Sequence, residues 1–261
     1  MPENLQEYFD FITETAYLAG RLTLGYYQVG VRADMKSDET PVTVADRLSE
    51  EFIRGRIEKR YPGHAIVGEE FGASQHKSAS HRWFIDPIDG TKSFIHGVPL
   101  YAVLIGLEIE GEVQTGAAYF PALDEMLAAA SGLGCWWNGK RAHVSSISRL
   151  SDAVVTFTDP AGFARHGRGE EWERIQKACY YRAGWTDAYG YMLTATGRAE
   201  LTLDAAMNVW DCGPFPPIFS EAGGFFGDWQ GNPTIYANEA IATSQVLLPE
   251  LLELIRGSKE N

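Results

Sequence analysis

The sequence predicts a layered mixed α/β fold (α+β) made of two closely joined halves, and three observations support this prediction. Amphipathic helical patterns alternate with short apolar strands along most of the chain. No segment repeats with a period of about 20–50 residues, which excludes a solenoid. The 261 residues, 45% of them hydrophobic, can bury a substantial core. We expect an N-terminal half, 1–145, and a C-terminal half, 146–261, which together form one compact unit.

The first half begins with two predicted helices. Apolar residues recur at steps of three and four between Leu5 and Ala19, which indicates an amphipathic helix. A second pattern predicts a helix from about Ala45 to the stop at Tyr61-Pro62-Gly63. Residues 71–81 are small, polar and rich in histidine, and we expect them to form a mobile loop.

Strands account for the rest of the first half. The apolar runs 101–109 and 113–120 flank Glu110-Gly111-Glu112 and predict a hairpin. Further short strands are expected at 65–67, 83–85, 126–130 and 134–137.

In the second half, strands alternate with helices. A strand is expected at 154–158. Pro216 and Pro217 lack the N–H group that a helix interior needs, so we expect the regular helix there to begin near Ile218. Helical patterns lie at 170–179, 187–197, 211–222 and 249–257.

Charge and cysteine usage restrict the partners and the compartment. The formal net charge of −13 repels phosphate backbones and anionic lipid, which argues against a nucleic-acid or membrane-surface binder. Cys135, Cys179 and Cys212 form no CxxC pair, so we expect reduced thiols and a cytoplasmic location. We find no signal-peptide pattern and no apolar run near the ~20 residues that span a bilayer.

Three short apolar segments end in acidic residues, and we interpret each of them as the C-terminal end of a strand. They are Ile66-Val67-Gly68-Glu69-Glu70, Phe84-Ile85-Asp86-Pro87-Ile88-Asp89 and Val209-Trp210-Asp211. Ligands of layered α/β folds bind beyond strand ends, so these carboxylates can converge. Their mutual repulsion favours a divalent cation, and an oxygen-only ligand set selects Mg²⁺ over Zn²⁺. Taken singly, the Asp86 to Asp89 segment is equally well a turn, Glu69-Glu70 is more often a solvated strand end, and Asp211 is most often a helix N-cap. The functional interpretation depends on the joint occurrence of all three.

The segment Asp86-Pro87-Ile88-Asp89-Gly90-Thr91 is the most informative. Pro87 biases Asp86 towards extended geometry, so we expect a sharp turn that directs both carboxylates and the Ile88 carbonyl to one metal cluster. The N–H groups of Gly90 and Thr91, at the start of a helix, would bind phosphate. The two-residue spacing of the aspartates disfavours an aspartyl-phosphate and favours direct attack by metal-activated water.

These motifs resemble those of the inositol monophosphatase superfamily of magnesium-dependent phosphatases. The resemblance covers nearly the whole chain. It implies a layered αβαβα sandwich, a homodimer, and hydrolysis of a small phosphorylated metabolite. Its residues are Asp38, Pro41 to Asp46, Gly68-Glu69-Glu70, Trp83 to Thr91 with Phe94, Trp210-Asp211 and Glu221-Ala222-Gly223-Gly224.

The resemblance also implies a role for each matched residue. Asp46 and Thr91, with Glu69, would orient and deprotonate the attacking water. Gly90 and Thr91 would hold the phosphate. Two or more Mg²⁺ ions would be bound by Glu69, Asp86, the Ile88 carbonyl, Asp89 and Asp211.

We expect residues of the second half to determine the substrate specificity. Asp204 stands where inositol phosphatases carry an acidic residue that contacts sugar hydroxyls. Asp187 stands where they carry a small residue, and an added carboxylate suits an ammonium or imidazolium group. From residue type alone, Asp187 is equally well a cap of the following helix. The six histidines show no metal-ligand spacing and are expected at the surface or in loops. Tyr189 and Tyr191 are expected in the core, and the alternative is a wall that stacks on an imidazole ring.

The run from Asp187 to Tyr191, together with Gly90-Thr91-Lys92-Ser93-Phe94 and Gly97-Val98-Pro99, resembles the histidinol-phosphate phosphatase branch. This resemblance implies Mg²⁺-dependent hydrolysis of L-histidinol phosphate in histidine biosynthesis. The alternatives are an inositol-1-monophosphatase or a broader sugar-phosphate phosphatase with the same metal chemistry. A more distant alternative is a catalytically silent protein that binds a phosphorylated ligand.

Overall fold

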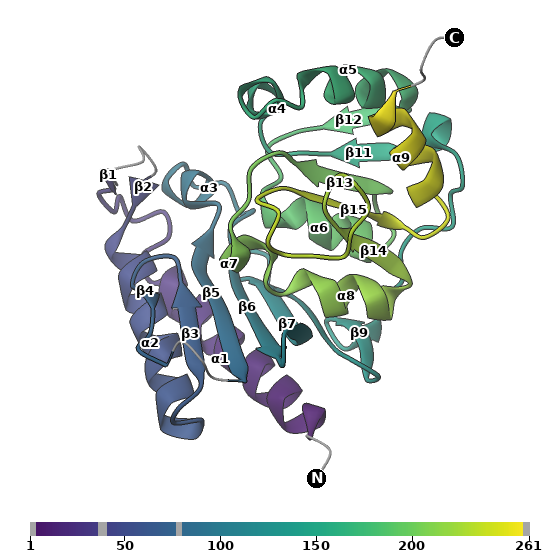
Figure 1. The fold of residues 1–261 in the computed structure, drawn as a ribbon. Coiled ribbons are helices and arrows are strands. Elements are labelled where there is room, and N and C mark those ends of the chain that lie inside the picture. Colours follow the sequence, from purple (N-terminus) through teal and green to yellow (C-terminus); the bar gives the residue numbers. More distant parts are fainter. Residues whose placement is uncertain (1–3, 36–40, 77–79, 258–261) are drawn as a thin grey trace.

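The computed structural model describes residues 4–35, 41–76 and 80–257 and forms five layers. The two large β-sheets lie between three layers of helices, in the order helix, sheet, helix, sheet, helix, and β1 (Asp34–Met35) and β2 (Pro41–Val42) form a separate two-stranded sheet (Figure 1). The expected αβαβα sandwich is therefore confirmed. Asp38 lies outside the described residues.

The first helix layer consists of α1 (Leu5–Leu24) and α2 (Val44–Arg60). Ile12 of α1 and Ile53 of α2 belong to one buried cluster with apolar residues of the first sheet. Thr43 caps α2: its side chain accepts a hydrogen bond from the Ala45 N–H, and its own backbone N–H donates to Asp46. Both predicted helices are confirmed, and α1 runs one turn further than the sequence pattern indicated.

The first sheet has eight strands in the order β10-β9-β8-β7-β6-β5-β3-β4. The predicted hairpin is β6–β7, and the four further strands expected in this half are also present. β3 and β5 run parallel, so their C-terminal ends lie at the same edge. The strands are β3 (Ala65–Gly68), β4 (Gly72–Ala73), β5 (His81–Asp89), β6 (Ala102–Ile109), β7 (Glu112–Phe120), β8 (Glu125–Ala130), β9 (Gly134–Trp137) and β10 (Lys140–Arg141).

The segment 71–81 differs from the expected loop. Gly72–Ala73 forms the edge strand β4 against β3, and His81 begins β5. The Arg54 guanidinium donates a hydrogen bond to the Gly72 carbonyl and ties this edge to α2. A contact from a distant helix thus orders a sequence that has no strand pattern of its own. Residues 77–79 lie outside the described part.

The middle layer holds α6 (Ala188–Ala195), α7 (Val209–Cys212) and α8 (Phe215–Ala222). Two predictions were wrong here. Val209-Trp210-Asp211 is a helical turn and not a strand, because Asn208 and Asp211 form a capping box. α8 begins at Phe215 and not near Ile218, because its prolines occupy the first turn, where N–H groups have no partner within the helix.

The second sheet has five strands in the order β12-β11-β13-β15-β14. Its strands are β11 (Val154–Thr156), β12 (Tyr181–Ala183), β13 (Leu201–Asp204), β14 (Gly224–Gly227) and β15 (Ala240–Ser244). The third helix layer covers its far face and consists of α4 (Pro160–Arg165), α5 (Gly169–Ala178) and α9 (Leu248–Arg256). The remaining short elements are α3 (Thr91–Ile95) and the 3₁₀ turn Leu150–Asp152.

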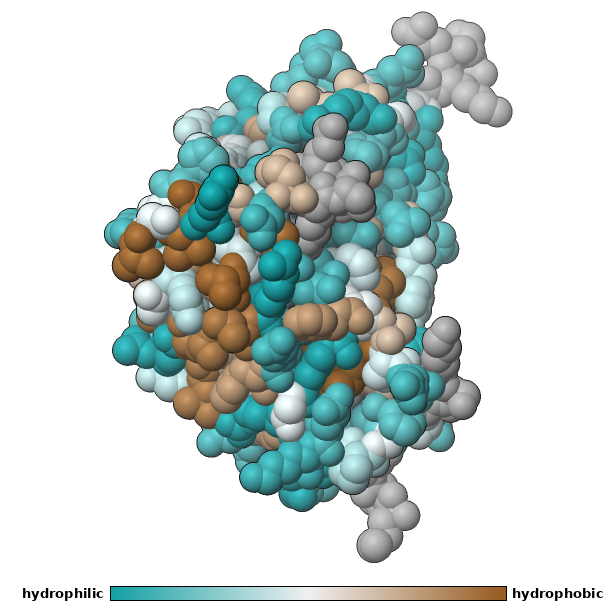
Figure 2. Space-filling model, turned by 90° about the vertical axis from the view of Figure 1, so that its left-hand side faces the viewer, coloured by the Kyte–Doolittle hydropathy of each residue, from teal (hydrophilic) through white to brown (hydrophobic). Residues whose placement is uncertain are grey.

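The chain passes from the first sheet to the second between Arg141 and Val154. The division into halves 1–145 and 146–261 stays a prediction. Cys135, Cys179 and Cys212 are buried and free. Within the described ranges, no helix is both long and apolar enough to span a membrane. Figure 2 shows hydrophobic side chains gathered on one part of a mainly hydrophilic face.

Candidate active site

Three carboxylates meet where β5 ends. The side chains of Asp86, Asp89 and Asp211 place one oxygen each within 4.8 Å of the others. The first two residues belong to β5, and the third belongs to α7, about 120 positions later in the chain. Sequence reasoning named all three, and the structure brings them together.

A β-bulge places the two aspartates of β5 on the same site. The pairing of β5 with β6 changes register between Asp86 and Asp89, where Pro87 has no N–H to donate. The Ile88 N–H donates to Asp86 Oδ1 at 3.0 Å and closes the bulge. The expected sharp turn beyond a strand end is therefore a bulge inside the strand, which continues to Asp89.

Asp211 reaches the cluster because α7 and α8 press closely on the first sheet. A Cβ atom added to Gly106 would lie 2.2 Å from the Gly213 carbonyl oxygen, and one added to Gly116 would lie 2.1 Å from that of Pro214. Only glycine permits this approach. The Asn208 N–H donates to Asp211 Oδ2 at 2.7 Å and orients the carboxylate.

The cluster has the electrostatics of a cation site. Burial raises the pKa of Asp86 well above its usual value, and the charges of Glu69, Asp89 and Asp211 raise it further. Burial also raises the pKa of Asp211 to about 6. A bound divalent cation would remove this repulsion, and carboxylate oxygens are ligands for a hard cation. The donor set therefore fits a divalent metal ion.

Asp46 and Thr91 form a hydrogen-bonded pair beside the cluster. Thr91 Oγ1 donates to Asp46 Oδ1 at 3.3 Å and lies 3.2 Å from the Ile88 carbonyl oxygen. The other carboxylate oxygen, Oδ2, accepts hydrogen bonds from the Thr43 N–H at 2.8 Å and the Thr43 hydroxyl at 2.6 Å. Burial raises the pKa of Asp46, and the charge of Glu69 contributes in the same direction. The capping box of α2 thus holds a carboxylate that can accept a proton through Thr91.

Glu50 supports the turn that carries Glu69, and sequence reasoning missed it. This side chain is fully buried and accepts hydrogen bonds from the Glu70 N–H at 2.7 Å and from Arg54 Nε at 2.7 Å. A Cβ atom at Gly68 would lie 2.1 Å from Glu50 Oε1, so the strand end rests directly on this carboxylate. The available signal was the i, i+4 spacing of Glu50 and Arg54 on a predicted helix.

Gly90 and Thr91 begin α3, where phosphate binding was expected. Gly90 occupies the N-cap position with a φ of 77°, a conformation that glycine adopts without strain. A Cβ atom there would lie 2.8 Å from Asp187 Oδ2. The predicted phosphate-binding backbone and one predicted substrate residue are thus in contact.

Asp187 does not cap α6 through its side chain. Its Oδ2 accepts a hydrogen bond from Ser93 Oγ at 2.6 Å, and burial raises the pKa of this carboxyl. The Ala188 N–H, at the start of α6, donates instead to Asp89 Oδ2 at 2.7 Å. A carboxylate of the first sheet therefore receives the N-terminus of a helix of the middle layer.

Asp204 ends β13 and is held by Tyr191, whose hydroxyl donates to Asp204 Oδ2 at 3.1 Å. Burial raises the pKa of Asp204 to about 7, and the charge of Asp187 adds to this effect. Tyr191 is only 1% exposed, which confirms its predicted place in the core, whereas Tyr189 is partly buried against the same cluster.

Among the described histidines, His81 departs from the expected surface or loop positions because it begins β5, whereas His64 lies in the loop between α2 and β3. His64 Nδ1 accepts a hydrogen bond from Trp83 Nε1 at 3.1 Å, and the His64 ring stacks on His81 with a centroid distance of 4.3 Å. Burial, followed by the effect of His81, lowers the pKa of His64 to about 4. An aromatic cluster encloses this histidine at the start of β5, away from the carboxylates.

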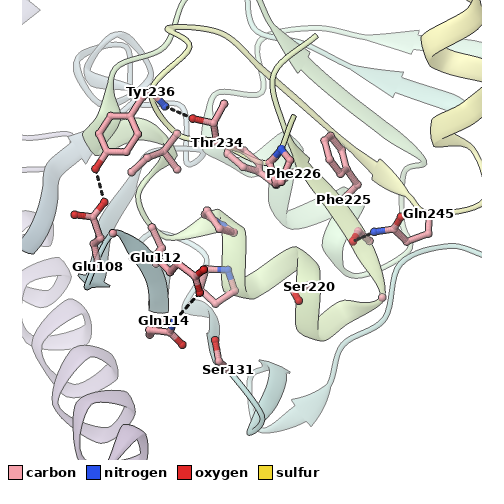
Figure 3. A pocket seen from close by; sticks show the side chains of 18 residues that line it. Glu108, Glu112, Gln114, Ser131, Ser220, Phe225, Phe226, Thr234, Tyr236 and Gln245 are labelled. Carbon is pink, nitrogen blue, oxygen red and sulfur yellow. Dashed lines mark hydrogen bonds between the residues drawn. The ribbon is translucent and has the colours of Figure 1, made fainter. Parts of the chain in front are cut away.

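A separate pocket of about 610 Å³ lies at the other end of the first sheet (Figure 3). Its wall includes Glu108, Phe225 and Tyr236, and Tyr236 donates a hydrogen bond to Glu108. Glu108 pairs with Arg82 near the start of β5. None of the predicted site residues lines this pocket.

Known proteins resemble this chain over nearly its whole length. The profile of the inositol monophosphatase family matches residues 4–260. A histidinol-phosphatase of Chlorobaculum parvum is 42% identical over 233 residues, which cover 88% of this chain and 89% of that protein. An inositol-1-monophosphatase of Mesorhizobium japonicum is 31% identical over 94% of each chain. The solved structure of the extragenic suppressor protein suhB of Bartonella henselae has a TM-score of 0.88 at 27% identity, covering 95% of this chain and 98% of that one.

Proposed function

Because the chain belongs to the inositol monophosphatase family and is a phosphoric monoester hydrolase, we propose that it hydrolyses L-histidinol phosphate to L-histidinol and phosphate. The proposal places this reaction in histidine biosynthesis. The observation that carries it is the Asp187 carboxylate beside Gly90, supported by the 42% identity to a histidinol-phosphatase.

The cofactor in this proposal is Mg²⁺, two or more ions per site. Glu69, Asp86, the Ile88 carbonyl, Asp89 and Asp211 would hold the ions, and the all-oxygen donor set favours magnesium over zinc. When bound, Mg²⁺ offsets negative charge on the phosphate and on the leaving oxygen and lowers the pKa of water.

The residues around the cluster carry the remaining chemistry. Backbone N–H groups of Gly90 and Thr91 would hold phosphate oxygens at the start of α3. The Thr91 hydroxyl, which donates to Asp46 Oδ1, would accept the proton of the attacking water as its own proton passes to the carboxylate. Asp46 suits this role because burial raises its pKa and thus its affinity for a proton.

Asp187 and Asp204 would select the leaving group. L-Histidinol phosphate carries an ammonium group and an imidazole, and a buried carboxylate attracts either cation more strongly than it attracts a neutral polyol. Asp187 lies next to Gly90, so it is close to the expected phosphate position. Asp204 lies at the end of β13; its charge raises the pKa of Asp89, and the charge of Asp187 raises the pKa of Asp204.

A panel of phosphate esters tests the substrate. We expect kcat/KM for L-histidinol phosphate to exceed that for inositol 1-phosphate by at least about 10-fold, which corresponds to one charge-assisted hydrogen bond. Asp187→Asn should remove most of this preference. Faster hydrolysis of inositol 1-phosphate by the unaltered enzyme would refute the proposed substrate.

The second candidate is an inositol-1-monophosphatase or a broader sugar-phosphate phosphatase. It is favoured by Asp204, which stands at the position of a hydroxyl-binding acidic residue, and by the 31% identity to an inositol-1-monophosphatase. The same panel distinguishes it.

The proposal also includes a homodimer and a cytoplasmic location. Exposed apolar side chains of the first half, such as Leu18, Val29 and Ile95, are candidates for the dimer interface. Light scattering on the purified protein would measure the mass of the assembly. The cytoplasmic location rests on the unpaired cysteines.

A further inference from the structure

Two residues just before α6 have left-handed backbone conformations. Trp185 has a φ of 59°, and Asp187 has a φ of 44° with a ψ of −143°. Residues other than glycine adopt such backbone angles rarely and at a cost in conformational free energy. Hydrogen bonds to β11 and its continuation stabilise this segment: the Trp185 N–H donates to the Thr158 carbonyl at 3.0 Å. The strained backbone directs both side chains towards α3.

A short hydrogen-bond chain joins these two side chains through Ser93. Trp185 Nε1 donates to Ser93 Oγ at 2.9 Å, and Ser93 Oγ donates to Asp187 Oδ2 at 2.6 Å. The directions are unambiguous because an indole N–H can only donate and an ionised carboxylate can only accept. The indole therefore occupies an acceptor position of Ser93 and directs its single hydroxyl proton to Asp187.

The position of Asp187 is also limited by Gly90. Asp187 Oδ2 lies 2.8 Å from the place where a Cβ atom of residue 90 would stand. The serine hydrogen bond and this close contact both involve Oδ2, so Oδ1 is the oxygen that neither of them occupies. A cation that reaches Oδ1 must lie near the phosphate that Gly90 and Thr91 are proposed to bind.

Trp185 contributes little to the core. Its side chain is 48% exposed, and its described ring contact is an edge-on one with His96 of the neighbouring loop at 6.1 Å between centroids. Ser93, in contrast, is fully buried. A large, partly exposed aromatic residue in a strained conformation, bonded to a buried serine, is better explained by its effect on Asp187 than by packing.

We propose that Trp185 and Ser93 are positioning residues that hold the Asp187 carboxylate so that it receives an ammonium group two carbons from the phosphate-ester oxygen. This inference rests on the proposed function and deepens it. L-Histidinol phosphate has its amine at that distance. The inference extends to any short 2-aminoalkyl phosphate, and it makes the amine, rather than the imidazole, the group that Asp187 binds.

The experiment uses two small esters that differ in charge, 2-aminoethyl phosphate and ethyl phosphate. The unaltered enzyme should prefer the aminoethyl ester. Trp185→Phe, which keeps a ring but removes the N–H, should lower the ratio of kcat/KM between the two esters about 3- to 10-fold, mainly through KM for the aminoethyl ester. Ser93→Ala should lower it further. Tyr180→Phe, on a side chain that is 71% exposed, serves as the matched control.

A double variant tests whether Trp185 acts through Asp187. In an Asp187→Asn background, Trp185→Phe should not change the ratio further, because the carboxylate that it positions is gone. Equal losses on both esters, or an additive effect in the double variant, would overturn the inference. If Ser93→Ala does not fold, the Trp185 series still decides the outcome.

The same data separate this inference from the proposed substrate. An enzyme that prefers the aminoethyl ester through Trp185 but does not hydrolyse L-histidinol phosphate would refute the substrate and support the positioning role. An unaltered enzyme without any preference for the aminoethyl ester would overturn the positioning role, whichever larger ester it hydrolyses.

Discussion

The protonation of three aspartates sets the pH at which their cluster can hold a cation. Asp211 has a pKa raised to about 6, and burial raises those of Asp86 and Asp89 well above the usual value. Each proton on the cluster competes with a metal ion for the same oxygens. Above these pKa values the carboxylates repel one another, and a cation relieves that repulsion.

We therefore expect the affinity for Mg²⁺ to rise between pH 5 and pH 7.5. Binding should release protons, because the raised pKa values leave the cluster partly protonated before the metal binds. Isothermal titration calorimetry in two buffers with different enthalpies of ionisation would measure this release. A pH-independent affinity without proton release would contradict the pKa directions.

His64 provides a test of the fold that is independent of the metal. Its pKa is lowered to about 4, so between about pH 6.5 and pH 4 the unfolded chain binds a proton that the folded protein does not. The His64 contribution to the free energy of unfolding should therefore fall as the pH falls through this window. His64→Gln keeps an acceptor for Trp83 and should weaken the pH dependence, as measured by urea unfolding from pH 7 to pH 4.5. His166→Gln, at an exposed position, should leave the pH dependence unaltered.

At the scale of the element, two contacts between backbones position the site. The bulge in β5 aligns Asp86 with Asp89, and the packing of α7 and α8 on Gly106 and Gly116 brings in Asp211. The bulge follows from a local feature, the missing N–H of Pro87. The helix packing follows from glycines that are about 100 positions distant in the sequence.

Gly116→Ala should disturb this packing. The added Cβ would lie 2.1 Å from the Pro214 carbonyl oxygen, so α7 and α8 must shift. We expect a loss of about 1–3 kcal/mol in the free energy of unfolding and a weaker affinity for Mg²⁺, because Asp211 moves with α7. Denaturant unfolding and calorimetry would measure the two effects.

Gly55→Ala is the matched control for that substitution. Gly55 lies within α2, where an added Cβ would have no neighbour within 4 Å. Alanine favours a helix over glycine by about 0.5–1 kcal/mol, so this variant should be slightly stabilised and should bind Mg²⁺ normally. Destabilisation at both positions to the same extent would show that the close approach at Gly116 has no special role.

At the scale of the whole molecule, the candidate site joins the two sheets. Asp89 of β5 accepts a hydrogen bond from the Ala188 N–H of α6, and Ser93 of α3 donates to Asp187, just before α6. Asp211 is contributed by the helix layer between the sheets. A ligand bound there would contact the first sheet and the middle helix layer and should stabilise them together.

Mg²⁺ with inorganic phosphate should therefore raise the melting temperature. Ligands at 100 times their dissociation constant add about 2.7 kcal/mol to stability, which corresponds to several degrees for a protein of this size. Differential scanning fluorimetry would measure the shift, which should be lost in Asp86→Asn but kept in Asp152→Asn, an exposed aspartate. A shift that Asp86→Asn retains would place the ligands elsewhere.

Much of the fold could be predicted from local patterns. The periodicities that begin at Leu5 and near Ala45 gave helices, and the paired apolar runs of the first half gave the hairpin β6–β7. The predictions were wrong where a local capping signal was misread or where contacts with distant residues determine the secondary structure. Val209-Trp210-Asp211 is apolar like a strand, yet Asn208 caps it as a helix. β4 depends on a hydrogen bond from Arg54.

The sequence by itself determined the family, the layered fold and the set of candidate ligands, because motif spacing and hydrophobic periodicity are local properties of the chain. Only the tertiary structure decided which side chains meet. The placement of Glu50 beneath Gly68, the acceptance of the α6 N-terminus by Asp89, and the chain from Trp185 through Ser93 to Asp187 each join residues of different elements. Such contacts depend on the packing of layers, and no local pattern of residues encodes them.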